Sequence, residues 1–104
     1  MKPNIKSTLV MSGKNKFWAL FSLDVHDEQS AEVIARAVRK AGIGMATRYD
    51  KSTYTLQMAS EEIKATYMTA RRVLSIIERD VIEVIENTLI KNTVLVNKIS
   101  WRAE

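Results

Sequence analysis

The feature that most constrains this chain is the periodic apolar pattern of residues 60–90, a segment that contains neither glycine nor proline. Apolar residues recur along the segment at alternating spacings of four and three, which is the period of one face of a helix. As a strand, residues 81–86 would mix acidic with apolar side chains on both faces. A helix is therefore the better interpretation, although the many β-branched residues favour strands. Ser60, followed by two glutamates, is its expected N-cap.

The length of this predicted helix suggests a role. Thirty residues would span about 45 Å, whereas a domain of this size has a radius of gyration of about 13 Å. The far end is therefore expected to overhang the sheet, or the helix to break near residues 78–80. Its apolar side chains also spread over roughly half of the circumference, against a ~100° stripe for an ordinary surface helix. We therefore predict a protein–protein surface, with a kinked helix folded back on its own core as the alternative. The predicted partner-binding residues are Ile63, Tyr67, Ala70, Leu74, Ile77, Val81, Val84 and Ile85.

The remaining patterns predict an α+β fold. Strands are expected at 7–12, 16–25, 45–49, 53–59 and 93–101. A shorter helix should begin after the N-cap Asp27 and end at Gly42, which can take the left-handed conformation. The order is that of a ferredoxin-like βαββαβ sandwich with an antiparallel sheet, an extra N-terminal strand and a long second helix.

The net positive charge is concentrated at the N-terminus. The 104 residues suit a single domain over 16–104, preceded by a basic N-terminal arm over 1–15 that could hold the extra strand. The net charge of +4 equals the charge of residues 1–16, because the rest of the chain balances. There is no cysteine, no signal-peptide pattern and no apolar run of membrane-spanning length. We expect a cytoplasmic protein with no membrane contact.

No catalytic constellation stands out. His26 is the only histidine, and its neighbours Asp24 and Asp27 would allow a metal or acid–base site. A solvated helix-capping turn is the more economical interpretation, because no second histidine or cysteine completes a zinc site. The segment at 41–44 contains two glycines but follows a helix, whereas phosphate loops precede one. We therefore expect no enzyme activity, no metal and no cofactor.

Two further surfaces are candidates. In the predicted sheet both helices cover one face, so Trp18 and Leu20 should lie on the other, where exposed aromatics favour dimerisation or base stacking. Shielding of Trp18 by the extra strand is the alternative. A nucleic-acid surface could be formed by Lys14, Lys16, Arg71 and Arg72, but the β-strand signature of RRM domains is not matched.

Three segments carry a resemblance to a known family. The stretch FWALFSLDVHDEQSAEVIARAV, the hairpin TRYDKSTYTLQMAS and the helix end IERDVIEVIE resemble the small dimerising subunit of the KEOPS (EKC) complex, over roughly residues 16–86. Members of that family tend to open the long helix with a Leu-Arg pair and then an Asn-Ser pair. The segment SEEIKATYMTARR has neither pair in place.

The resemblance implies a function without catalysis. The family's subunit dimerises and packs its helices on the catalytic subunit of a complex that modifies transfer RNA. We therefore predict a non-catalytic adaptor that forms a homo- or heterodimer, docks a protein partner through the long helix, and offers the basic arm as a candidate tRNA contact. The alternative is a small dimeric nucleic-acid-binding protein of ferredoxin-like fold.

Overall fold

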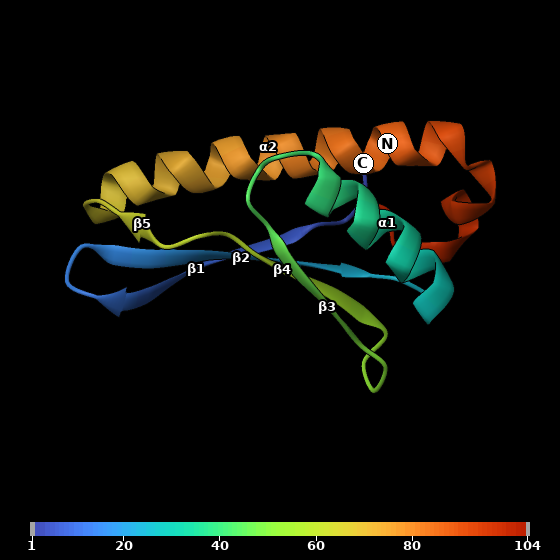
Figure 1. Cartoon of the computed structure of the whole chain (residues 1–104), viewed down its shortest axis with the longest axis horizontal. Coiled ribbons are helices and arrows are strands. Elements are labelled where there is room, and N and C mark those ends of the chain that lie inside the picture. Colours follow the sequence, from blue (N-terminus) through green and yellow to red (C-terminus); the bar gives the residue numbers. More distant parts are fainter. Residues whose placement is uncertain (1, 104) are drawn as a thin grey trace.

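The computed structural model describes residues 2–103, which form an α+β fold with both helices on one face of an antiparallel sheet (Figure 1). The strands are β1 (Lys6–Gly13), β2 (Lys16–Asp24), β3 (Ala46–Asp50), β4 (Thr55–Ala59) and β5 (Ile63–Lys64). The helices are α1 (Glu28–Lys40) and α2 (Tyr67–Lys91), and the 3-10 helix η1 (Thr93–Lys98) follows. The predicted fold class is confirmed, including the extra N-terminal strand, and the arrangement is compatible with a ferredoxin-like fold.

The sheet is built around β2, the longest strand. Its order is β1-β2-β4-β3, and β5 pairs with the first two residues of β2. Alternate residues of β2, from Phe17 to Leu23, are buried under the helices. Ahead of β1, Pro3 and Ile5 are also buried. The N-terminal segment predicted as an arm is therefore, from residue 3 onwards, an integral part of the fold.

Helix α1 begins and ends where its local signals predict. The N-cap Asp27 accepts a hydrogen bond from the Ser30 amide at 2.8 Å, which satisfies one of the free N–H groups of the first turn. Arg39 and Lys40 lie in the last turn, where cations are favourable. Gly42 takes a φ of +76°, a conformation that costs glycine little.

Helix α2 begins later than predicted, at Tyr67, with Thr66 rather than Ser60 as its N-cap. The hydroxyl of Ser60 is instead buried beside β2, where it accepts a hydrogen bond from the Ala19 amide at 3.0 Å. Ile63 then pairs with Phe17 as part of β5. The prediction of a helix from Ser60 was wrong because a contact between residues 41 positions apart occupies the capping hydroxyl.

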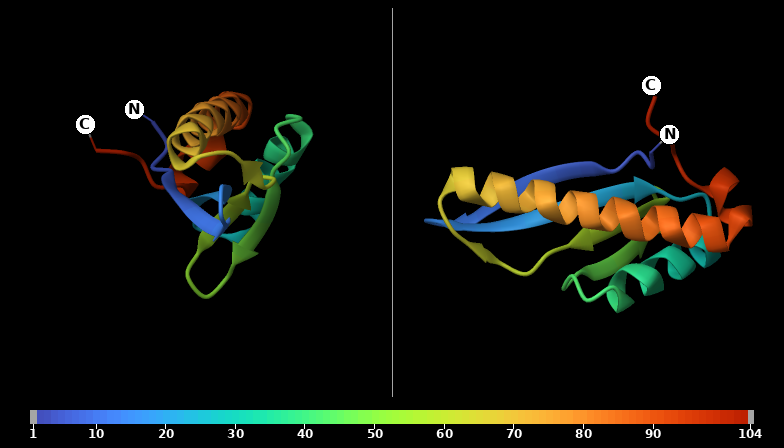
Figure 2. Two further views of the ribbon diagram at one scale, coloured as in Figure 1. Left: turned by 90° about the vertical axis from the view of Figure 1, so that its left-hand side faces the viewer. Right: turned by 90° about the horizontal axis from the view of Figure 1, so that it is seen from above.

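Helix α2 lies along the sheet, and its last turns extend past the ends of the strands, as expected, but there η1 lies against them (Figures 1 and 2). The overhanging end is therefore covered by the protein's own C-terminal segment. The 25 residues of α2 make one unbroken helix of about 38 Å in a molecule whose longest extent is 42 Å. The long hairpin of β1 and β2 extends the sheet beneath the first half of the helix, and α1 packs beside the second half (Figure 2). Residues 81–90 are helical, as expected. Within residues 2–103, neither helix combines the length and the apolar character that a membrane crossing requires.

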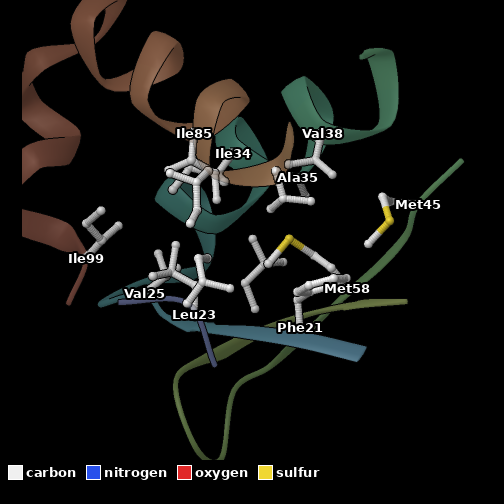
Figure 3. Packing of buried hydrophobic residues seen from close by; sticks show 14 of the residues in the cluster. Phe21, Leu23, Val25, Ile34, Ala35, Val38, Met45, Met58, Ile85 and Ile99 are labelled. Carbon is white, nitrogen blue, oxygen red and sulfur yellow. The ribbon is translucent and has the colours of Figure 1, made fainter. Parts of the chain in front are cut away.

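The core lies between the helices and the sheet. Figure 3 shows Leu23 and Val25 below Ile34 of α1 and Ile85 of α2, all of which are almost completely buried. Ile99 closes the same cluster from the C-terminal segment.

The predicted closing strand at 93–101 is wrong. Residues 93–98 form η1, and only single bridges follow, from Ile99 to Val25 and from Trp101 to Pro3. The position beside β2 that a closing strand would take is already filled by β1. The extra strand therefore replaces the last strand of the sandwich, since β2 has only two edges and β1 and β4 occupy them.

Candidate interaction surfaces

The predicted partner-binding residues on the long helix mostly face the protein's own core. Ala70, Leu74, Val81 and Ile85 are buried against the sheet, and Ile77 and Val84 are half-buried at the margin of the same cluster. Ile63 is half-buried on β5, and Tyr67, with 56% of its surface exposed, is the most accessible of the eight. A partner could not reach the buried four unless α2 left the sheet. The broad apolar stripe is therefore explained by burial within the monomer.

The face of the sheet opposite the helices is uncovered, and Trp18 and Leu20 lie on it, as predicted, with 37% and 38% of their surfaces exposed (Figure 1). Hydrogen bonds of the intervening strand residues show which face of the sheet the helices cover. Ser7 of β1 donates a hydrogen bond to Glu78 of α2, and Thr47 of β3 accepts one from Arg39 of α1. Their strand neighbours must therefore point away from the helices.

We call this uncovered surface the open face. The strand register arranges its side chains in rows that cross the sheet. One row is Asp24, Thr55 and Asp50; the next is Lys6, Ser22, Gln57 and Arg48; then come Thr8, Leu20, Ala59 and Ala46; then Val10 and Trp18; and the last is Lys16 and Lys64. An apolar middle thus lies between charged rows, and the two outermost rows have opposite charge.

The centre of the open face is hollowed. A shallow depression of about 470 Å³ lies between Thr8, Leu20, Ala46 and Arg48. Small side chains, Ala46 and Ala59, form its floor beside Leu20, because β3 and β4 carry no large apolar residue on this side. The hollow has an apolar floor and a cationic margin, Lys6 and Arg48, and can accept a complementary protein surface or a flat ring.

The predicted nucleic-acid residues lie at one end of the molecule. Lys14 and Lys16 are at the tip of the β1–β2 hairpin, where the Ala65 amide donates a hydrogen bond to the Asn15 carbonyl at 2.9 Å. This bond places the start of α2, with Arg71 and Arg72, at the same end (Figures 1 and 2). Lys64, which the sequence did not single out, is the strand partner of Lys16. We call Lys14, Lys16, Lys64, Arg71 and Arg72 the basic end.

The neighbourhood of His26 has the character of a capping turn. The Asp27 carboxylate accepts a hydrogen bond from the Ser30 amide, and this bond holds the pKa of Asp27 below its ordinary value of 3.8. The Lys98 ammonium, 3.5 Å away, lowers the pKa further, as a smaller cause. The carboxylate therefore serves the helix and stays ionised. Among residues 2–103, no group of three or more histidine, cysteine or acidic side chains could hold a metal ion.

Sequence reasoning missed the part of the open face that comes from the outer strands. Lys6 and Val10 on β1, and Arg48 on β3, point to this side because their register partners Ser22, Trp18 and Gln57 lie on the open face. The alternation in 6–10 is visible in the sequence, but its direction depends on pairing with β2. Comparisons of the chain with protein-family models, curated proteins and solved structures find no match.

Proposed function

We propose that this protein is a non-catalytic interaction module that forms a homodimer by packing two open faces together. The observation that carries the proposal is the order of outward side chains along β2, which reads Lys16, Trp18, Leu20, Ser22 and Asp24. The strand has a cation at one end, an acid at the other and a leucine midway between them. A surface of this kind is complementary to a copy of itself turned end for end.

A two-fold axis through Leu20, running across the strands, makes the match concrete. In such an interface each contact occurs twice, because residue i meets residue j and j meets i. Leu20 then packs on Leu20 of the second copy, and Trp18 lies opposite Ser22. Lys16 lies opposite Asp24, so that the lysine row of each copy meets the acidic row of the other. Face-to-face sheets pack about 10 Å apart with strands roughly 30° from alignment, and both values allow these contacts.

The size of the open face suits a modest dimer. Strands β1, β2, β3 and β4 have 8, 9, 5 and 5 residues, and at about 3.4 Å per residue and about 4.8 Å between strands they give a flat footprint of roughly 440 Å². Side-chain relief raises the accessible area toward the ~800 Å² per partner of a standard interface. The resemblance to the dimerising KEOPS subunit agrees with this proposal, and in that case the dimer would serve as the adaptor of a larger complex.

The proposal is tested by reversing charges on β2. Lys16→Glu and Asp24→Lys should each weaken the dimer, because each places like charges opposite one another twice. The two changes together should restore it, because the charges that face each other across the interface would again be opposite in sign. Leu20→Asp should abolish it by burying a charge at the centre. Lys40→Glu, on α1 and away from the open face, is the matched control.

The measurement is sedimentation velocity between about 5 and 200 μM protein, with far-UV circular dichroism to verify folding. A monomer at all concentrations would refute the proposal. A dimer that survives Leu20→Asp would also refute it, because the copies would then meet through another surface. A single strand of nucleic acid that binds the monomer and is lost with Trp18→Ala would assign the open face to the alternative function instead.

A further inference from the structure

The basic end is a concentration of charge that the fold does not neutralise. Its five cations are all exposed, and the neighbouring acids are Glu61 and Glu62, which leaves +3 of the chain's net +4 at this end. The ion pairs between described residues involve other cations: Arg36 and Arg39 pair with Glu32, Lys51 with Glu28, Arg79 with Asp80, Lys98 with Asp27, and Arg102 with Glu78. A net charge of +3 concentrated at one end is repulsive, so binding an anionic ligand there would reduce this repulsion.

An aromatic ring lies among these cations. Tyr67, the first residue of α2, is 56% exposed, and its ring meets Phe17 edge-to-face at 6.0 Å. Phe17 is buried, so it holds one edge of the tyrosine ring while the rest faces solvent. Arg71 follows one helical turn later on the same side of α2. A fixed, exposed aromatic ring flanked by cations is the arrangement that binds an unpaired base together with its phosphates.

The positions of the cations indicate which kind of anionic partner the basic end can bind. Lys16 and Lys64 point to the open-face side of the sheet, whereas Arg71 and Arg72 are on the helix side. A flat lipid surface cannot contact both sides at once, but a flexible strand can pass around the hairpin tip. A stacked duplex also presents no free base to Tyr67. We infer that the basic end binds single-stranded nucleic acid, with Lys14, Lys64, Arg71 and Arg72 on phosphates and Tyr67 stacked on a base.

This function goes beyond dimerisation. Of its four phosphate contacts only Lys64 belongs to the lysine row of the proposed dimer interface, so dimerisation would withdraw one contact and leave three. The end-for-end dimer described above would place the two basic ends at opposite ends of the assembly. Arg71, Arg72 and Tyr67 lie on the helix side and would remain accessible in either state. Binding and oligomeric state can therefore be measured separately in the same variants.

The test uses fluorescence anisotropy with a labelled 12-nucleotide oligouridine and a 12-base-pair duplex RNA as the comparison. Four phosphate contacts predict a slope of log K against log salt of about −3, so that affinity falls about 50- to 100-fold between 50 and 200 mM salt. Arg71→Gln with Arg72→Gln should weaken binding at 50 mM salt and reduce the slope by about 1.4. Tyr67→Leu should weaken it about 5- to 150-fold while leaving the slope unchanged.

The matched control is Arg36→Gln with Arg39→Gln on α1, which removes the same charge from cations already paired with Glu32. This pair should bind nearly as well as the unaltered chain. The inference is overturned if the unaltered protein does not bind oligouridine at 50 mM salt, or if the control pair loses as much as the Arg71 and Arg72 pair. Tighter binding of the duplex than of the single strand would overturn it too. Capture by phosphatidylserine vesicles without RNA binding would mark a lipid site and have the same consequence.

Discussion

The broad apolar stripe of α2 belongs to the core of the monomer, and one pair of substitutions on the helix tests this directly. Ile85 and Ile76 are nine residues apart on α2, with 0% and 49% of their surfaces exposed. Changing either to alanine removes the same atoms from the same helix and gains the same small helix propensity. Any difference between the two variants therefore reports burial.

The magnitude follows from the environment of Ile85. It is enclosed by the helices and the sheet as part of the main cluster, so truncation removes buried methyl groups and leaves a cavity. Such changes cost about 2–5 kcal/mol, a large part of the ~5–15 kcal/mol by which a domain of this size is stable. A loss of about 3 kcal/mol would lower Tm by roughly 12–24 °C. Ile76→Ala should change the unfolding free energy by less than about 0.5 kcal/mol.

Urea unfolding followed by circular dichroism at 222 nm provides the assay. With an m-value of about 1.5 kcal/mol/M, the Ile85→Ala midpoint should fall by about 2 M. Two protein concentrations are needed, because a dimer makes the midpoint concentration-dependent. Equal midpoints for the two variants, or a loss below about 1 kcal/mol for Ile85→Ala, would mean that α2 does not pack on this sheet. The stripe would then again be available to a partner.

Two further predictions concern hydrogen bonds. Hydrogen bonding by the Ser30 amide holds the pKa of Asp27 below 3.8. The ionised carboxylate therefore stabilises the fold fully at pH values above 3.8, and this stabilisation is lost as the pH falls through the lowered pKa. Thermal unfolding between about pH 6 and pH 2.5 should show a steeper acid loss than in Asp27→Asn, and parallel curves would contradict this. Ser60→Ala leaves the buried Ala19 amide without its acceptor and should cost about 1–3 kcal/mol in urea unfolding. The exposed Ser75→Ala should be nearly neutral, and equal effects would show that the Ser60 hydroxyl is not structural.

The elements that the sequence predicted well are those whose signals are local. Helix α1 is bounded by Asp27 and Gly42, each of which acts within a few residues of the helix end. The two hairpins and the continuation of α2 through 81–90 follow from periodicity alone. Trp18 and Leu20 were placed on the uncovered face because a strand alternates and the buried partners of β2 are uniformly apolar.

The predictions were wrong where a residue distant in the sequence determines the local structure. Ser60 has the sequence of a helix cap, but its hydroxyl is bound by Ala19 on β2. The segment 93–101 has the composition of a strand, but no edge of β2 was left for it. The rows of the open face could not be predicted from the sequence either, because only the strand register defines which residues lie beside Lys6 and Arg48.

The sequence by itself determined the helical or extended state of most segments, apart from 60–66 and 93–98, and how much apolar surface each one carries. These properties depend on backbone propensities, caps and side-chain periods that act over one or two turns. Only the tertiary structure decided which apolar surface is buried, because burial of a side chain depends on which elements pack against it. The N-terminal hairpin covers the first half of the α2 stripe, and α1 and η1 help to enclose the second half. Because both helices lie on one side of the sheet, the other face, with Trp18 and Leu20, is exposed to solvent.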